Sequence, residues 1–575
     1  MTPTQRFFGL LSLDKKEISY IYLYAIFSAL ITQTLPLGIQ AIISLVVGGS
    51  TSSSLYLLIG IITIGTALAG ILKIMQLTVT ETIQRRIFTR SAFEFAWRIP
   101  RFKTEKLLNT YPPELINRFF DTMNVQKGIP KILIDFSTAF LEVLFGLILL
   151  SFYHPFFVFF NILIVLLIII IFRLTGPRGL DTSLKESKYK YKVAHWLEEL
   201  GRAMNTFKLV GSCSMPTSRT DSLVAGWLNA RKNHFRILIF QYANVVAFKT
   251  IVTCALLGLG SVLVIDNQIS IGQFVAAEII VILVLNSVEK LILTMETIYD
   301  VLTGLEKIGT VTDLPLEEDN GLSFEEIDSA DSVRLSIEEV SFQFGDAIKP
   351  SINNVSFKVD AGERICLSGY NSSGKSTLAR IISGLYTSFD GNINYNDIPM
   401  RNLNTESLRS HIGTYSSQED LFHGSVIDNI SLGNSVTMND IIATSKRIGL
   451  HNYVNSLPNG YETELLAGGS NIPKNIRIKI MLARTIISQP KLLVLENFMS
   501  STASPEMEQV IRCLLDESEA WTVICVSNDP DVAKLCDRVV MMNKGEVVIE
   551  GKFDEVKHSE YGKEIFSLYD EAELA

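Results

Sequence analysis

The stretch Gly369-Tyr370-Asn371-Ser372-Ser373-Gly374-Lys375-Ser376 decides the fold of the C-terminal half of this chain. It fits the phosphate-binding pattern G-x-x-x-x-G-K-[ST]. The apolar run at 364–368 predicts a short buried strand before it, and the run at 377–382 predicts a helix after it. Together they would aim several backbone N–H groups and a helix dipole at one point, which suits a triphosphate. A chance match in a surface loop is the alternative, and the flanking pattern argues against it.

The same pattern assigns roles to individual residues. Lys375 would reach the β- and γ-phosphates, and Ser376 would supply a hydroxyl to Mg²⁺. The expected cofactors are therefore a nucleoside triphosphate and Mg²⁺. The residues of this segment expected to contact the nucleotide are Gly369, Asn371, Ser372, Gly374, Lys375, Ser376 and Thr377.

The composition predicts a membrane domain joined to a soluble one. The chain has 575 residues and 47% hydrophobic content, and the apolar excess lies in residues 18–305. We expect a transmembrane domain at 1–305 that begins with an amphipathic lead-in helix, a linker at 306–331 and a soluble domain at 332–575. The net charge of −9 argues against nucleic acid as a partner.

Six apolar segments are long enough to span a bilayer. Two long connections between them are rich in Lys and Arg, whereas the other connections are short and carry almost no charge. The positive-inside rule then places both termini and both long connections in the cytoplasm, as in a multi-pass protein of the inner (plasma) membrane. We expect the helices to continue well beyond the bilayer. The segments lie near 18–48, 54–78, 130–152, 156–175, 238–265 and 271–296.

After residue 331, strand and helix signals alternate and predict an α/β domain on a largely parallel sheet. Six membrane segments with two long cytoplasmic excursions, followed by a phosphate-binding domain, resemble one half of an ABC exporter. The resemblance implies an α-helical transmembrane bundle followed by an α/β P-loop ATP-binding domain. It also implies ATP and Mg²⁺ as cofactors. In that family two halves pair, and ATP lies between the P-loop of one half and the signature motif of the other.

Two further motifs carry the resemblance. Phe344 stands where the family has an aromatic residue that stacks on adenine, and stacking needs only a π face. A core aromatic on a strand is the alternative for Phe344. Gln418 resembles the glutamine that touches Mg²⁺ and the membrane domain.

The catalytic motifs depart from the family pattern. Glu496 takes the place of the metal-holding aspartate, and Asn497 the place of the glutamate that activates water. An amide does not accept that proton at neutral pH. Asn528 stands at the switch-histidine position, and residues 500–504 replace the D-loop without an aspartate. No residue is therefore assigned as catalytic, and whether the chain is an ATPase stays open.

The signature motif is the most altered. Counting back from Leu482-Ala483-Arg484 without gaps places Ile472-Pro473-Lys474-Asn475-Ile476 on the expected Leu-Ser-Gly-Gly-Gln. Proline has no N–H to offer a phosphate. The alternative, Leu466-Ala467-Gly468-Gly469-Ser470, looks more like the signature but lies six residues too early. Lys474 would either offer a positive charge to a γ-phosphate or be a solvated lysine.

Charged residues inside spans are functional candidates. By depth, Lys249 and Glu289 are expected to pair as a structural ion pair near the inner interface. Glu142 and Glu278 lie closer to the middle or outer half, where they would line a cavity for cationic or polar cargo.

Two functions follow. The first is an ATP-binding-driven exporter half-transporter with impaired or slow hydrolysis, working as a homodimer or heterodimer in membrane lipid. Residues 35–40 resemble the peptide and protein secretion branch of the family, and this resemblance implies a periplasmic adaptor protein as a further partner. The alternative is a non-hydrolysing ATP-binding scaffold or sensor subunit with the exporter fold.

Overall fold

A computed structural model describes residues 1–48, 53–108, 112–318, 320–327, 331–345, 347–416, 420–497 and 505–572. The chain divides into two compact units. The helical unit comprises Met1–Pro100 and Thr110–Leu314, and the α/β unit comprises Arg101–Asn109 and Pro315–Ala575.

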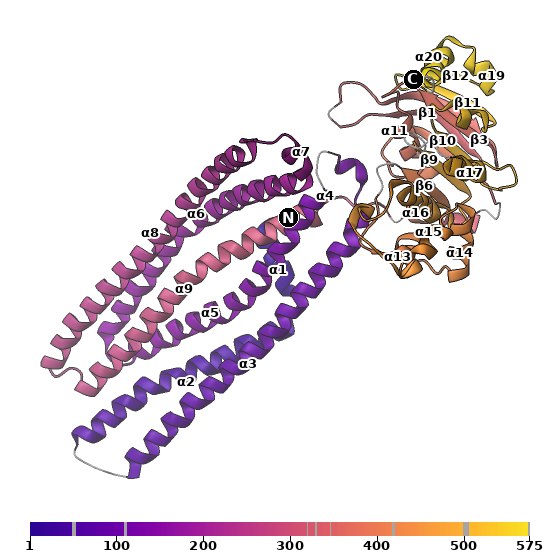
Figure 1. Cartoon of the computed structure of the whole chain (residues 1–575). Coiled ribbons are helices and arrows are strands. Elements are labelled where there is room, and N and C mark those ends of the chain that lie inside the picture. Colours follow the sequence, from indigo (N-terminus) through magenta and orange to yellow (C-terminus); the bar gives the residue numbers. More distant parts are fainter. Residues whose placement is uncertain are drawn as a thin grey trace. The chain divides into compact units, whose positions relative to one another are not determined.

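The helical unit is built from long helices that run side by side (Figure 1). Among the described residues, six helical stretches are long and apolar enough to cross a membrane, which confirms the six predicted spans. A short helix precedes them. The helices are α1 (Pro3–Ser12), α2 (Lys15–Val47), α3 (Ser53–Arg98), α4 (Pro112–Ile116), α5 (Asp121–Ser151), α6 (Pro155–Arg202), α7 (Met204–Leu209), α8 (Met215–Ile265) and α9 (Ile271–Thr312).

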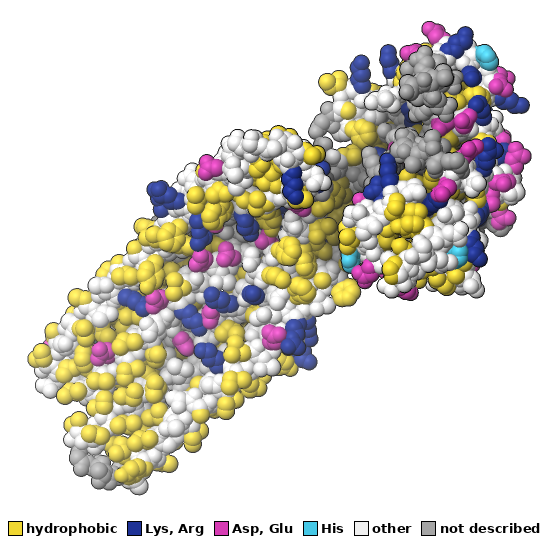
Figure 2. Space-filling model, in the orientation of Figure 1, with side chains coloured by type: hydrophobic (Ala, Val, Ile, Leu, Met, Phe, Trp, Pro, Cys, Tyr) yellow, Lys and Arg dark blue, Asp and Glu magenta, His cyan; other side chains and the backbone are white. Residues whose placement is uncertain are grey.

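Several of these helices are much longer than a bilayer is thick. The longest, α8, has 51 residues, about 76 Å at ~1.5 Å per residue, against a hydrocarbon core of about 30 Å. The basic connections of the sequence are therefore largely helix, as predicted. Hydrophobic side chains cover much of the face of the spans that Figure 2 shows, and many large hydrophobic residues of α2, α3, α6 and α8 are exposed, as expected for helices that face lipid.

Three helix pairs dominate the packing of this unit: α2 with α3, α5 with α9, and α6 with α8. The α5–α9 contact is tight at Gly128, where an added Cβ would lie 2.2 Å from Cγ2 of Val301. Ser270 is the N-cap of α9 and forms a capping box with Gln273. The Ser270 hydroxyl accepts from the backbone N–H of Gln273, and the Gln273 side chain accepts from the backbone N–H of Ser270.

The α/β unit centres on a six-stranded sheet with strand order β12-β11-β3-β10-β9-β6. The neighbours from β11 to β6 pair in parallel, and only β12 is antiparallel, so the predicted largely parallel sheet is confirmed. A second, antiparallel sheet has the order β2-β1-β4-β5. The strands are β1 (Leu335–Phe342), β2 (Ile352–Val359), β3 (Arg364–Gly369), β4 (Asp390–Tyr395), β5 (Ile398–Pro399), β6 (Ile412–Ser416), β7 (Gly424–Ser425), β8 (Glu464–Leu465), β9 (Leu492–Glu496), β10 (Thr522–Val526), β11 (Arg538–Asn543) and β12 (Glu546–Gly551).

Both faces of the parallel sheet are buried. Along β9, Leu493 and Leu495 belong to one hydrophobic cluster, while Leu492 and Val494 belong to another. Such two-sided burial is typical of parallel sheets covered on both faces, and it explains the continuous apolar runs of their strands. The helices of this unit are α10 (Phe324–Ile327), α11 (Lys375–Ile382), α12 (Thr405–Ser410), α13 (Val426–Ser431), α14 (Met438–Arg447), α15 (His451–Ser456), α16 (Lys474–Ile486), α17 (Pro505–Leu514), α18 (Pro530–Lys534), α19 (Phe553–Lys557) and α20 (Glu560–Ala572).

The tip of the first long connection belongs to the α/β unit. The carboxylate of Glu105 accepts from the backbone N–H groups of Thr387 and Ser388, the latter at 3.1 Å. The side chain of Phe102 is buried, and its backbone bridges to Leu316. Helix α9 runs to Thr312, so the first residues of the expected linker at 306–331 are helical.

Candidate nucleotide-binding site

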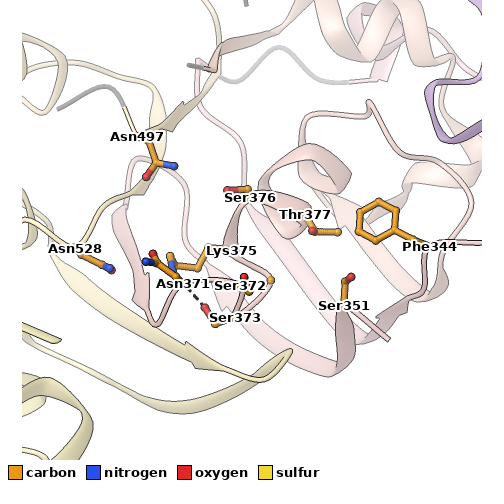
Figure 3. Close-up of a pocket in the computed structure, with 11 residues that line it drawn as sticks. Phe344, Ser351, Asn371, Ser372, Ser373, Lys375, Ser376, Thr377, Asn497 and Asn528 are labelled. Carbon is orange, nitrogen blue, oxygen red and sulfur yellow. Dashed lines mark hydrogen bonds between the residues drawn. The ribbon is translucent and has the colours of Figure 1, made fainter. Parts of the chain in front are cut away.

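A cavity of about 470 Å³ lies over the glycine-rich turn (Figure 3). Seven of the residues expected to contact the nucleotide line it: Phe344, Asn371, Ser372, Gly374, Lys375, Ser376 and Thr377. Ser351, Ser373, Asn497 and Asn528 complete the lining. Gly369, also expected to contact the nucleotide, is not among the described residues that line the cavity, and its carbonyl accepts from Nζ of Lys375.

The turn connects β3, which ends at Gly369, to α11, which begins at Lys375. Gly374 caps α11 with φ of 99°, a left-handed conformation that favours glycine. A Cβ at Gly374 would lie 2.4 Å from the carbonyl oxygen of Ser351, so the loop passes too close to the backbone for any side chain there. The result is a cradle at a helix N-terminus of the kind that binds phosphate.

Lys375 is held by the turn itself. Its Nζ donates to the carbonyls of Gly369 and Tyr370, both at 2.7 Å, and lies 3.3 Å from Oγ of Ser373. Burial lowers the pKa of Lys375 to about 8, because desolvation disfavours its charged form. The ammonium is therefore placed at the cavity before any ligand arrives.

Phe344 presents an aromatic ring to the cavity just after β1 (Figure 3). Its ring packs edge-on against Phe342, with centroids 4.9 Å apart, and against Tyr386, 6.0 Å apart. The ring is half-buried, so it is both anchored in the core and open to a ligand. This arrangement suits a base-stacking role.

Glu496 ends β9, as expected, but its carboxylate is engaged inside the domain. Oε2 accepts from Oγ of Ser416 at 2.8 Å, and Oε1 lies 3.6 Å from the guanidinium of Arg380 on α11. The side chain is buried and is not among the described residues that line the cavity. It lies one residue before Asn497, which does line the cavity.

Asn497 and Asn528 follow the ends of two neighbouring parallel strands, β9 and β10. Both amides border the cavity near Lys375 (Figure 3). Asn497 has φ of 51°, a conformation that asparagine tolerates better than most residues. Asn528 bonds to the backbone of Gly369. Two amides therefore occupy the positions where the resemblance expects a carboxylate and an imidazole.

The two stretches that could serve as the signature motif differ in their backbone contacts. Helix α16 begins at Lys474, directly after Pro473, and the amides of a first helical turn have no partner within their own helix. The alternative glycines are already used: the N–H of Gly468 donates to Leu421 at 2.7 Å and that of Gly469 to Leu466 at 2.8 Å. The N–H groups of Gly468 and Gly469 therefore have partners within the domain, and the assignment of the signature to Ile472, Pro473, Lys474, Asn475 and Ile476 stays a prediction.

Two predicted features fall outside the described residues: Gln418 and the altered D-loop at 500–504. Conversely, sequence reasoning missed Ser351, Ser416 and Arg380, whose partners are distant in the chain. Ser373 was also missed, although its position inside the glycine-rich motif could have identified it as a residue that lines the cavity.

Several charged residues of the spans have polar partners, whereas no hydrogen bond or ion pair is seen for Glu278 among the described residues. Lys249 on α8 forms the predicted ion pair with Glu289 on α9. Glu142 on α5 accepts from Oγ of Ser287 at 2.6 Å. Asp135 and Lys290 form a second pair, at 2.9 Å, that the sequence analysis did not anticipate.

Comparisons with known proteins agree with this architecture. The family models "ABC transporter transmembrane region" and "ABC transporter" match residues 18–288 and 352–499. The Escherichia coli alpha-hemolysin translocation ATP-binding protein HlyB is 26% identical over 376 residues, which are 65% of this chain and 52% of that protein. The toxin RTX-I translocation ATP-binding protein of Actinobacillus pleuropneumoniae is 25% identical over 363 residues, 63% of this chain and 51% of that protein. This chain therefore spans about half the length of these curated relatives.

A solved structure extends the likeness to nearly the whole fold. The structure of a bacterial Atm1-family ABC exporter with ATP bound matches with a TM-score of 0.83 and 16% identity, covering 96% of this chain and 99% of that one. Fold and site together define a multi-pass membrane protein with a P-loop domain of the ABC type. The chain belongs to the ABC transporters and carries both their transmembrane region and their ATP-binding domain.

Proposed function

We propose that this chain binds ATP in the cavity over the P-loop and, paired with a second half, uses that binding to export a substrate. One observation carries the proposal: the cavity collects the glycine cradle, Lys375, Ser376 and the Phe344 ring in a chain with six span-capable helices. These groups supply phosphate contacts at one end and a π face at the other, which is the layout of a nucleotide.

The residues present fit a magnesium nucleotide. Gly374 admits no side chain because the Ser351 backbone lies against it, and both Gly374 and the hydroxyl-bearing Ser376 line the cavity. We propose Ser376 as a metal ligand, with Gln418 and Glu496 as further candidates. Bound Mg²⁺ would neutralise phosphate charge.

Hydrolysis is expected to be slow. Asn497 supplies no general base, and losing a positioned base typically costs about 10²–10⁴-fold in rate. Pro473 removes one amide from the helix start that would face a partner's nucleotide. If the chain pairs with itself, both ATP sites would lack the base and the usual signature. If it pairs with a consensus half, one ATP site would lack the base and the other would lack the signature.

The relatives suggest the cargo and the setting. Their names describe translocation of alpha-hemolysin and of toxin RTX-I, and we extend this to peptide or protein secretion by this chain, with a periplasmic adaptor protein as a further partner. The basic long connections support cytoplasmic termini and an inner-membrane location.

A second function is favoured by the two amides at 497 and 528. A scaffold or sensor subunit would keep the fold and bind ATP without turning it over. Such a protein needs the P-loop and the Phe344 ring but neither the base nor the switch histidine.

The test measures ATP binding to the full chain in lipid nanodiscs by calorimetry, with Lys375→Ala as the matched control. Hydrogen exchange of α7 and of the cytoplasmic ends of α6 and α8 is recorded with and without ATP. An exporter half predicts ATP-dependent protection changes there that Lys375→Ala abolishes. ATP binding without such changes would support the scaffold, and absence of binding would overturn both.

A further inference from the structure

Asn528 makes two hydrogen bonds with a single residue of the P-loop. Its Oδ1 accepts from the backbone N–H of Gly369 at 3.0 Å, and its Nδ2 donates to the carbonyl of Gly369 at 2.9 Å. The side-chain amide therefore pairs with this residue as a neighbouring β-strand would.

The bonded carbonyl is also a holding point for the P-loop lysine. Nζ of Lys375 donates to the same Gly369 oxygen at 2.7 Å. Asn528 thus fixes an acceptor that orients the ammonium towards the cavity. A change that frees the Gly369 peptide would release one of the two carbonyls that hold Lys375 in place.

We call the two hydrogen bonds between Asn528 and Gly369 the clamp. The residue before Asn528 is itself hydrogen-bonded to β3. Ser527, the preceding residue, donates its N–H to Leu367 at 3.2 Å, and its carbonyl accepts from Oγ of Ser368 at 2.6 Å. Both partners lie on β3, directly before Gly369. On the other side, Gly369 approaches β11 so closely that a Cβ would lie 2.0 Å from the carbonyl oxygen of Met542.

Only a side-chain amide suits this geometry. It carries a donor and an acceptor side by side, so it can bond both polar groups of one residue. The two ring nitrogens of a histidine point away from each other and cannot do so. The residue expected by resemblance would therefore break the pairing seen here.

We propose that Asn528 is a positioning residue that holds the P-loop in its phosphate-accepting shape and that it does not read the γ-phosphate. The proposal rests on ATP binding at this cavity. Because the clamp acts on the first residue of the loop and on Lys375, it supports the cradle that ATP and ADP share.

The test compares ATP and ADP affinity of the full chain in nanodiscs for wild type, Asn528→Ala, Asn528→His and the control Asp531→Asn, an exposed change three residues away. Loss of two neutral hydrogen bonds predicts affinity about tenfold weaker for both nucleotides in Asn528→Ala. We expect Asn528→His to lose ADP affinity by a similar factor, since imidazole cannot restore the pairing.

The outcomes separate the alternatives. A loss confined to ATP would mean that Asn528 contacts the γ-phosphate, and unchanged affinity with a lower melting temperature would mean a purely structural role; either result overturns the clamp. Wild-type ADP affinity in Asn528→His would also overturn the clamp. If Asn528→Ala does not fold, the ADP affinity of Asn528→His is the deciding measurement. Failure of wild type to bind any nucleotide would instead reject the proposed function.

Discussion

Lys375 makes nucleotide binding sensitive to pH. Burial lowers its pKa to about 8, so in the free protein the ammonium is largely present at pH 7 and increasingly lost above pH 8. Bound phosphate favours the charged form, so binding above pH 8 must take up a proton. We expect ATP affinity to be nearly flat below pH 7 and to fall by up to about tenfold per pH unit above pH 8.

Titration calorimetry between pH 6.5 and 9.5 measures this dependence. The Lys375→Ala variant binds more weakly and should show no such decline in the same range. An affinity that stays constant to pH 9 in wild type would contradict the assignment. The stability of the free protein changes with pH in the opposite direction. The lysine binds its proton more tightly in the unfolded chain, so the free energy of unfolding rises with pH between about 8 and 10.5.

At the residue scale, the sequence predicted the residues of the P-loop motif that line the cavity. It did not predict the contacts that residues of the site make with distant parts of the chain. The residues from Asn371 to Thr377 are local, and their geometry follows from the turn and the helix start. Asn528 and Gly369 are 159 residues apart, and Arg380, the partner of Glu496 on α11, is also remote from it in sequence. No periodicity or spacing reports such pairs, because parallel strands bring them together only in the folded sheet.

At the scale of the helices, the ion pair of Lys249 and Glu289 joins α8 to α9, two helices long and apolar enough to span a membrane. Replacing Lys249 with methionine leaves a carboxylate without its partner in a poorly solvated place, and we expect a loss of about 1–3 kcal/mol in unfolding free energy. The double variant Lys249→Met, Glu289→Leu removes both charges and should recover most of that loss. Thermal unfolding in detergent measures it, and a double variant less stable than the single one would refute the interpretation.

The C-terminal helix is tied to the P-loop. The hydroxyl of Tyr370 donates to the carboxylate of Glu564 on α20, and this bond with Glu564 helps raise the pKa of Tyr370 to about 12. Tyr370→Phe removes the bond, and we expect hydrogen exchange in α20 to accelerate about two- to tenfold. Tyr453→Phe in the same domain is the control. Unchanged hydrogen exchange of α20 in Tyr370→Phe would show that the Tyr370–Glu564 hydrogen bond does not stabilise the helix.

Helices were predictable here because length and hydropathy are local properties. Each predicted span lies within one of the long helices, apart from Gly48 and Phe152, which directly follow α2 and α5. The ends of the helices, however, could not be placed. Helix α9 runs to Thr312, through polar residues expected in the linker, because its buried face continues through Leu305, Gly309 and Val311. Such continuation depends on packing partners, which composition does not reveal.

At the scale of the whole molecule, the two-unit organisation followed from composition alone, and the parallel sheet followed from the alternation of strands and helices. The central claim concerns what the assembled chain does with ATP. The P-loop, the Phe344 ring and the clamped Lys375 are built to bind a nucleotide, whereas Asn497 supplies no base for its hydrolysis.

The most direct measurement is Mg²⁺-ATP binding and hydrolysis by the purified full chain, side by side, with Lys375→Ala as the control. We predict that ATP binds and that binding is much weaker in the control, while turnover in wild type stays at the level of the control. Turnover well above that of Lys375→Ala would contradict the account, because it would mean that this chain hydrolyses ATP without a carboxylate at position 497.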